Sequence, residues 1–204
     1  FFENSFFGKG EAEYLYQLIR QFKPKNFYEI GSGFSTKIAS QALKRNQLEA
    51  GIKSNHVCIE PYEVPWLENL KVKVFRELVQ NLDLSLFSNL GENDFLFIDS
   101  SHIIRPQGDV LHEYLEIIPS LNSGVIIHIH DIFTPRDYLE SWIKEDVHFW
   151  NEQYLLEALL TNSNRYEIIA ALNHLHHYYF EELKNVCPYL DKSNEPGSFY
   201  FKVK

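Results

Sequence analysis

The feature that most constrains the fold of this chain is a set of short apolar segments that alternate with longer segments of helical periodicity. The apolar segments are continuous, without alternating polar residues, and lie at 27–30, 56–60, 72–75, 95–98 and 125–129. Such strands are typical of a parallel sheet with both faces covered by helices. Helices are expected near 11–22, 35–49 and 109–118, so the pattern indicates a doubly wound α/β fold. Two further strands, 166–172 and 198–203, flank a helix near 178–186 and would add a final antiparallel strand.

A glycine turn follows the first strand, in the sequence EIGSGFST. Gly31 and Gly33 let a ligand approach the backbone closely, and Ser35 or Thr36 is expected to cap the next helix. The free N–H groups at the start of that helix attract an anionic group such as a carboxylate or a phosphate. The turn therefore predicts a ligand site at the carboxyl end of the first strand.

Polar residues also close the second, fourth and fifth strands. Glu60 ends the second strand, the sequence DSSH (99–102) follows the fourth, and His130 and Asp131 close the fifth. An acid at the position of Glu60 can accept hydrogen bonds from ribose hydroxyls. Because the carboxyl ends of parallel strands share one edge, these groups are expected to gather around a single ligand.

The ordered set EIGSGFST, IEPY, FLFIDSSH and HIHDIF, followed by PRDY and WNEQYLLEALL, resembles class I methyltransferases that use S-adenosylmethionine (SAM). The resemblance covers about residues 5–203 and is closest to small enzymes related to sugar and natural-product O-methyltransferases. It implies a Rossmann-like sheet of seven strands in the order 3-2-1-4-5-7-6, with strand seven antiparallel and helices on both faces.

The resemblance also implies roles for individual residues. The segment from Glu29 to Gly33, including Gly31 and Ser32, and Ser35 would line the methionine end of SAM, and Glu60 would hold the ribose. Asp99 would lie near the amino group or the reacting centre, and adenine would lie between the loop after Glu60 and the segment 77–81.

A hydroxyl acceptor becomes a good nucleophile once its proton is removed. His130 is the predicted general base, because the unperturbed pKa of histidine lies near 6.5, and Asp131 is expected to orient it or to face the acceptor. His102 is the second candidate. His128 is expected to be a hydrogen-bonded core histidine, since it points to the same side of its strand as His130.

A metal is the other question raised by the resemblance. Some related O-methyltransferases bind a divalent cation through an Asp after strand four, an Asp after strand five and an adjacent Asn or Asp. Asp99 and Asp131 would suit Mg²⁺, but Ile132 stands where the third ligand would be. Metal dependence is therefore not expected from the sequence.

We expect one domain over 1–204, with an N-terminal helical cap at about 1–23 and a segment at about 132–150 that is either a lid over an acceptor pocket or a packed helix face. Aromatic side chains in this segment suit a sugar or an aromatic acceptor. The chain begins at Phe1 and has no Met, so further residues are expected upstream in the translated product.

The charge of the chain favours small-molecule partners. With 19 Lys and Arg against 28 Asp and Glu, the net charge is −9, which argues against nucleic acid and against an anionic membrane surface. Two cysteines make no disulfide framework and fit a reducing, cytoplasmic setting. The sequence leaves open the acceptor, the oligomeric state and two other functions. These are an NAD-dependent Rossmann oxidoreductase, although Thr36 replaces the third glycine of its fingerprint, and a non-catalytic SAM-binding module.

Overall fold

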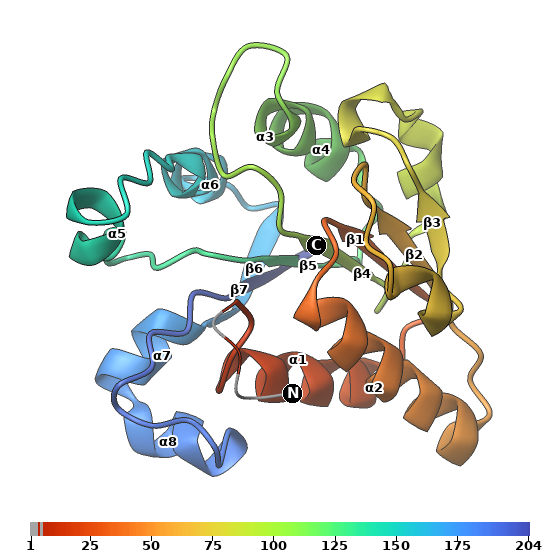
Figure 1. The fold of residues 1–204 in the computed structure, drawn as a ribbon, viewed down its shortest axis with the longest axis horizontal. Helices are drawn as coiled ribbons and strands as arrows, with labels where there is room; N and C mark the ends of the chain where they lie inside the picture. Colours follow the sequence, from red (N-terminus) through yellow and green to blue (C-terminus); the bar gives the residue numbers. More distant parts are fainter. Residues whose placement is uncertain (1–3, 5) are drawn as a thin grey trace.

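Seven strands form one mixed sheet in the computed structural model, which describes residue 4 and residues 6–204 (Figure 1). The order is β3-β2-β1-β4-β5-β7-β6, which confirms the order implied by the resemblance. The strands are β1 Asn26–Ile30, β2 Asn55–Ile59, β3 Lys73–Phe75, β4 Phe95–Ile98, β5 Ile126–Ile129, β6 Tyr166–Ala171 and β7 Phe199–Val203.

The first five strands are parallel, and β7 pairs antiparallel with both β5 and β6. The central strands β1, β4 and β5 are almost wholly buried. This burial explains why their sequences are apolar without alternation, since helices cover both faces.

Two layers of helices enclose the sheet. In Figure 1, α1 and α2 lie on one face together with α7 and α8, and α3, α4 and α6 lie on the other. The α-helices are α1 Glu11–Phe22, α2 Phe34–Ala50, α3 Asp109–His112, α4 Ile118–Ser120, α5 Glu140–Lys144, α6 Glu152–Leu160, α7 Leu172–Tyr178 and α8 Phe180–Val186. Three short 3-10 helices lie between β2 and β4, namely η1 Leu67–Leu70, η2 Val79–Asn81 and η3 Leu84–Asn89. One π-helical segment, η4 Glu113–Ile117, joins α3 to α4.

Several predicted boundaries differ from the structure. Helix α2 begins at Phe34 with Gly33 as its N-cap, so neither Ser35 nor Thr36 is the cap. The hydroxyl oxygen of Thr36 instead accepts a hydrogen bond from the Gly33 N–H at 3.1 Å. The predicted helix near 178–186 corresponds to α8, whereas α7, which begins directly after β6, was not predicted.

The predicted N-terminal cap is described only in part. Residues 1–3 and 5 lie outside the described residues, and α1 packs against α2 on the sheet. None of the helices in the described part of the chain combines the length and the apolarity needed to cross a membrane.

Candidate active site

The register of the sheet aligns four of the predicted site residues along its carboxyl edge. Ile30 of β1 is paired with Ile59 of β2 and Ile98 of β4, and the latter with Ile129 of β5. The next residues along these strands are Gly31, Glu60, Asp99 and His130. The sequence prediction that they share one edge is confirmed.

Gly31 lets β1 and β4 approach each other at this edge. Its φ is +86°, and a Cβ added there would lie 2.1 Å from the backbone oxygen of Asp99. No side chain fits at that distance, and a positive φ is costly for residues other than glycine. The glycine therefore places the Asp99 backbone directly against the turn.

A cavity of about 310 Å³ opens beside this turn. It is lined by the segments 30–32, 59–62, 78–80 and 99–101, together with Arg105 and Asp109. The Glu60 carboxylate is fixed at its wall, because its two oxygens accept hydrogen bonds from the N–H groups of Ser32 (3.1 Å) and Tyr62 (3.0 Å). The cavity thus joins the glycine turn, the acid of the second strand and the segment predicted to face adenine.

Four of the seven predicted cofactor residues line this cavity, and three do not. Gly31, Ser32, Glu60 and Asp99 form part of the wall. The others, Glu29, Gly33 and Ser35, lie outside the lining.

Glu29 is fully buried on the sheet face that α2 covers. Its Oε2 lies 2.9 Å from His56 Nε2 and accepts a hydrogen bond from the thiol of Cys58 at 3.3 Å. In this position Glu29 supports the strand beneath the glycine turn, and its predicted contact with the methionine end of SAM stays a prediction.

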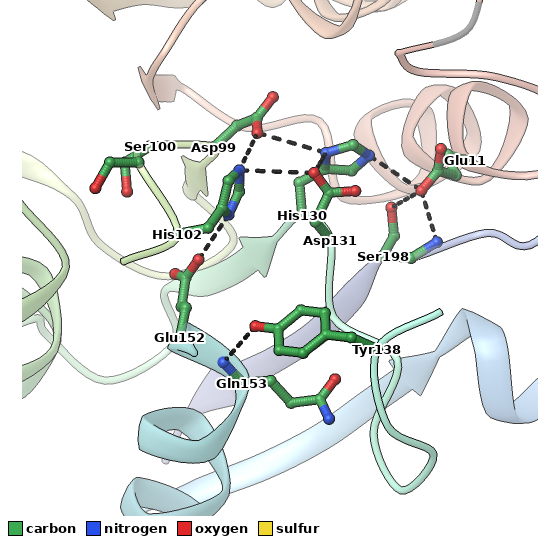
Figure 2. Close-up of polar contacts among 12 residues, drawn as sticks. Glu11, Asp99, Ser100, His102, His130, Asp131, Tyr138, Glu152, Gln153 and Ser198 are labelled. Atoms are coloured by element: carbon green, nitrogen blue, oxygen red, sulfur yellow. Dashed lines mark hydrogen bonds and ion pairs between the residues drawn. The ribbon is translucent and has the colours of Figure 1, made fainter. Parts of the chain in front are cut away.

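Two histidines and two aspartates cluster next to the cavity (Figure 2). Nε2 of His102 lies 3.3 Å from Asp99 Oδ1 and 3.6 Å from Asp131 Oδ2. Nδ1 of His130 lies 3.5 Å and 3.4 Å from the same two oxygens. The four side chains predicted separately for cofactor binding and catalysis therefore form one group.

Each histidine also has an outer carboxylate partner, as Figure 2 shows. His102 Nδ1 lies 2.8 Å from Glu152 Oε2, and His130 Nε2 lies 3.1 Å from Glu11 Oε1. Glu11 is fixed in turn by the N–H of Gly197 at 2.8 Å. Because a carboxylate only accepts hydrogen bonds, these contacts place a proton on Nδ1 of His102 and on Nε2 of His130.

Sequence reasoning predicted neither Glu11 nor Glu152 as a partner of a histidine. Both stand in the first turn of a helix, where acids are common because they complement the helix dipole. Glu11 is 119 residues from its partner His130, and no local pattern in one sequence links them.

The carboxylates raise the pKa of both histidines. Burial alone lowers the pKa of His102, but hydrogen bonding and charge from Asp99 and Glu152 outweigh it and raise this pKa to about 10. Burial also lowers the pKa of His130. The negative charges of Asp131, Glu11 and Asp99 raise it by more, so this pKa is well above its usual value. The neighbouring carboxylates therefore favour the protonated form of both rings, and the predicted role of His130 as general base stays a prediction.

Ser100 lines the cavity next to Asp99. Its hydroxyl donates a hydrogen bond to Glu113 Oε2 at 2.9 Å. Burial, followed by the charges of Glu152 and Asp109, raises the pKa of Glu113 well above its usual value. Ser100 is thus tied to a buried carboxyl group beside the cavity.

Trp150 packs against the ring of His102. The two ring centroids are 4.3 Å apart, and Trp142 lies 5.1 Å from Trp150 edge to face. The segment 132–150 contains one helix, α5, and is anchored by Tyr138, whose hydroxyl oxygen accepts the Gln153 N–H at 3.0 Å. The segment lies against the cluster, and its role as a lid is untested.

His128 is a buried histidine, as predicted, but it is not hydrogen-bonded. Its ring stacks on Tyr200 at 4.1 Å and meets Phe97 edge to face at 4.5 Å. Neither of its nitrogens forms a hydrogen bond with the residues that the structure describes. Burial lowers its pKa well below the usual value, so the ring is neutral and packs as an aromatic core residue.

The strand order, the antiparallel β7 and a cavity between a glycine turn and a strand-end acid define the fold of the class I methyltransferases. Residues 28–132, half of the chain, match a family model described as a methyltransferase domain, and the chain belongs to this family.

A stretch of 95 residues is 33% identical to an uncharacterized protein from Archaeoglobus fulgidus. This match covers 44% of the present chain and 42% of that protein, so the chain spans less than half the length of this relative.

Three solved structures show the same fold over nearly the whole chain. An O-methyltransferase from Bacillus cereus, in complex with SAH, has a TM-score of 0.56 at 17% identity and covers 95% of this chain and 80% of its own. A putative O-methyltransferase from Klebsiella pneumoniae has a TM-score of 0.58 at 13% identity, with coverage of 95% and 79%. TomG from Streptomyces achromogenes, an O-methyltransferase in complex with SAM, has a TM-score of 0.55 at 13% identity, with the same coverage.

Proposed function

We propose that this protein is a SAM-dependent methyltransferase that methylates an oxygen of a small molecule, such as a sugar or natural-product hydroxyl. The observation that carries the proposal is the position of Asp99. It lines the same cavity as Gly31 and Glu60 and also belongs to the cluster with His102 and His130. The proposed cofactor site and the proposed acceptor site therefore meet at one carboxylate. The SAM and SAH complexes among the similar structures support the choice of cofactor.

Glu60 is proposed to hold the ribose. Each oxygen of a carboxylate has two lone pairs, and one on each side of Glu60 is already used by a backbone N–H. The remaining lone pairs can accept the two ribose hydroxyls. The adenine would lie between Tyr62 and the segment 78–80, at the far end of the cavity from Asp99.

When bound, SAM supplies an electrophilic methyl group on a sulfonium. The protein must hold an acceptor oxygen in line with that methyl group and keep water away. We assign the handling of the acceptor proton to the cluster of Asp99, His102, His130 and Asp131 as a whole. Both rings are already paired with carboxylates, so His130 alone is no longer the favoured base. Trp150 and Trp142 would form an apolar wall of the acceptor pocket.

The proposal includes the organisation of the chain. Residues 1–204 would form one methyltransferase unit, with α1 as a cap that contributes Glu11 and the segment 132–150 as a lid. Cys58 and Cys187 are both buried and unpaired, which supports a reducing, cytoplasmic setting.

The test is transfer of a labelled methyl group from SAM to fractionated small molecules of the source cell. We expect label in at least one fraction, stable to mild base as an ether would be. Binding of SAM without transfer to any fraction would favour the non-catalytic module, and reduction of NAD⁺ by the same fractions would favour the oxidoreductase.

A further inference from the structure

We propose that Asp99, His102, His130 and Asp131 bind a transition-metal dication, such as Zn²⁺, Mn²⁺ or Co²⁺, in preference to Mg²⁺. This site goes beyond the proposed function, because metal binding can be measured with neither SAM nor an acceptor present.

The distances within the cluster fit metal ligands better than direct hydrogen bonds. The four nitrogen-to-oxygen distances are 3.3, 3.6, 3.5 and 3.4 Å, whereas N–H···O bonds are about 2.7–3.2 Å. Donors at 90–109° around an ion with bonds of about 2.1 Å lie roughly 3.0–3.4 Å apart. The ligand atoms of Asp99, His102 and Asp131 all lie within 4.8 Å of one another. A small contraction would bring these donors into contact with one ion.

His130 provides an independent indication. It is 3% exposed, and its Nδ1 forms no hydrogen bond with any residue that the structure describes. This buried nitrogen points instead at Asp99 Oδ1 and Asp131 Oδ2. The two carboxylates thus lie at ion-pair distance without hydrogen-bond geometry, and a metal ion held between them would satisfy this buried nitrogen directly.

The outer carboxylates place the ring nitrogens as a metal requires. Metal-binding histidines usually donate their other N–H to a carboxylate, which fixes the ring and its tautomer. Glu152 does so at His102 Nδ1 and Glu11 at His130 Nε2. The other ring nitrogens, His102 Nε2 and His130 Nδ1, are thereby directed at the two aspartates, where a metal ion would displace any proton that they carry.

The donor set explains the preference for a transition metal. Mg²⁺ favours oxygen ligands, whereas imidazole suits Zn²⁺ and its neighbours. The sequence lacks the third oxygen ligand of a magnesium site, since Ile132 follows Asp131. Two imidazoles take that place. An ion can enter from the cavity side, where the Asp99 side chain is 33% exposed.

The test is a titration of the EDTA-stripped full chain with Co²⁺, Zn²⁺ and Mg²⁺, without SAM. Equilibrium dialysis measures bound metal, and the visible absorption of Co²⁺ reports nitrogen and oxygen ligands. We expect one Co²⁺ per chain, bound at least about 100-fold more tightly than Mg²⁺. His102→Asn and His130→Asn should each weaken Co²⁺ binding at least about tenfold, and His177→Asn, a histidine on α7 outside the cluster, should leave it unchanged.

Two further variants keep the test decisive if the histidine variants fail to fold. Glu11→Gln and Glu152→Gln retain the shape of the side chain and should weaken Co²⁺ binding about 10–100-fold, with circular dichroism reporting on the fold. The proposal is overturned if Mg²⁺ binds as tightly as Co²⁺, if no dication binds at millimolar concentration, or if all folded variants bind Co²⁺ like the wild type. Calorimetry with SAM on the metal-free protein separates these outcomes from failure of the proposed function.

Discussion

At the scale of the residue, the site depends on close approaches that only particular side chains permit. Gly31 has the Asp99 backbone where its own Cβ would be, and Glu60 is held by two N–H groups. The sequence could predict both residues, since a glycine turn and a strand-end acid are local patterns. The sequence could not predict that Glu29 contacts His56 and Cys58, because these contacts depend on how β1 and β2 pair and how α2 packs over them.

Gly31→Ala should abolish SAM binding and destabilise the fold by about 2–3 kcal/mol, because it adds a clash with Asp99 to the cost of a positive φ. Gly51→Ala is the matched control. Its φ is +69°, but a Cβ there meets nothing within 4 Å, so it should cost only about 1 kcal/mol and retain SAM binding. Urea denaturation and calorimetry measure both effects, and equal behaviour of the two variants would contradict the proposed role of the close approach.

Glu60→Gln should weaken SAM binding at least about tenfold, because one side-chain oxygen and its negative charge are replaced by an amide. Equilibrium dialysis with labelled SAM measures the change. Glu63→Gln, an exposed residue three positions further on, should bind SAM like the wild type. An unchanged affinity in Glu60→Gln would exclude Glu60 from the ribose site.

At the scale of the element, the strands could be predicted more fully than the helices. Residues 27–30, 95–98 and 125–129 are apolar throughout because β1, β4 and β5 are covered on both faces. The pattern of the tail already suggested a final antiparallel strand, whereas the order of the strands came from the resemblance, since strand order cannot be read from periodicity. Helix α7 was missed because it begins at Leu172, directly after β6, with no glycine or proline between them to mark the boundary.

Changes in the segment 132–150 should affect methyl transfer to the acceptor and leave the affinity for SAM unchanged. Trp150→Ala would open His102 to water, so we expect methyl transfer to fall at least about tenfold while SAM affinity stays unchanged. Phe149→Ala removes a neighbouring ring that is 73% exposed and should have little effect. Steady-state kinetics and calorimetry distinguish these results. A loss of SAM affinity in Trp150→Ala would place this residue in the cofactor site.

The contact of Glu195, in the segment before β7, with α7 should contribute stability that depends on pH. Burial raises the pKa of the Glu195 carboxyl group. Hydrogen bonds from His177 and Asn173 outweigh this effect, so the pKa of Glu195 is lowered. A carboxyl group with a lowered folded pKa stabilises the fold above its unfolded pKa, about 4.3, and loses this contribution as pH falls through the folded value.

Glu195→Gln should therefore have a lower Tm than the wild type at pH 6, and the difference should shrink as the pH falls below the unfolded pKa of about 4.3. Thermal denaturation followed by circular dichroism measures it, with Glu181→Gln on the exposed side of α8 as the control. A Tm difference that does not change with pH would show that the ionised Glu195 contributes nothing.

At the scale of the whole molecule, the site is assembled from segments that are distant in the sequence. Glu11 comes from the first helix and Glu152 from the sixth, and both reach histidines at the ends of β4 and β5 (Figure 2). The sequence predicted the inner cluster because its members follow strands. The outer carboxylates depend on how α1 and α6 pack on the sheet, and this packing has no signature in a single sequence.

The most direct test of the account is a calorimetric titration of SAM and, separately, of NAD⁺ into the wild-type protein. The account predicts one SAM bound per chain and no heat from NAD⁺, since the cavity joins Gly31 to Glu60 without the third glycine of a dinucleotide fingerprint. Binding of NAD⁺ without binding of SAM would contradict it.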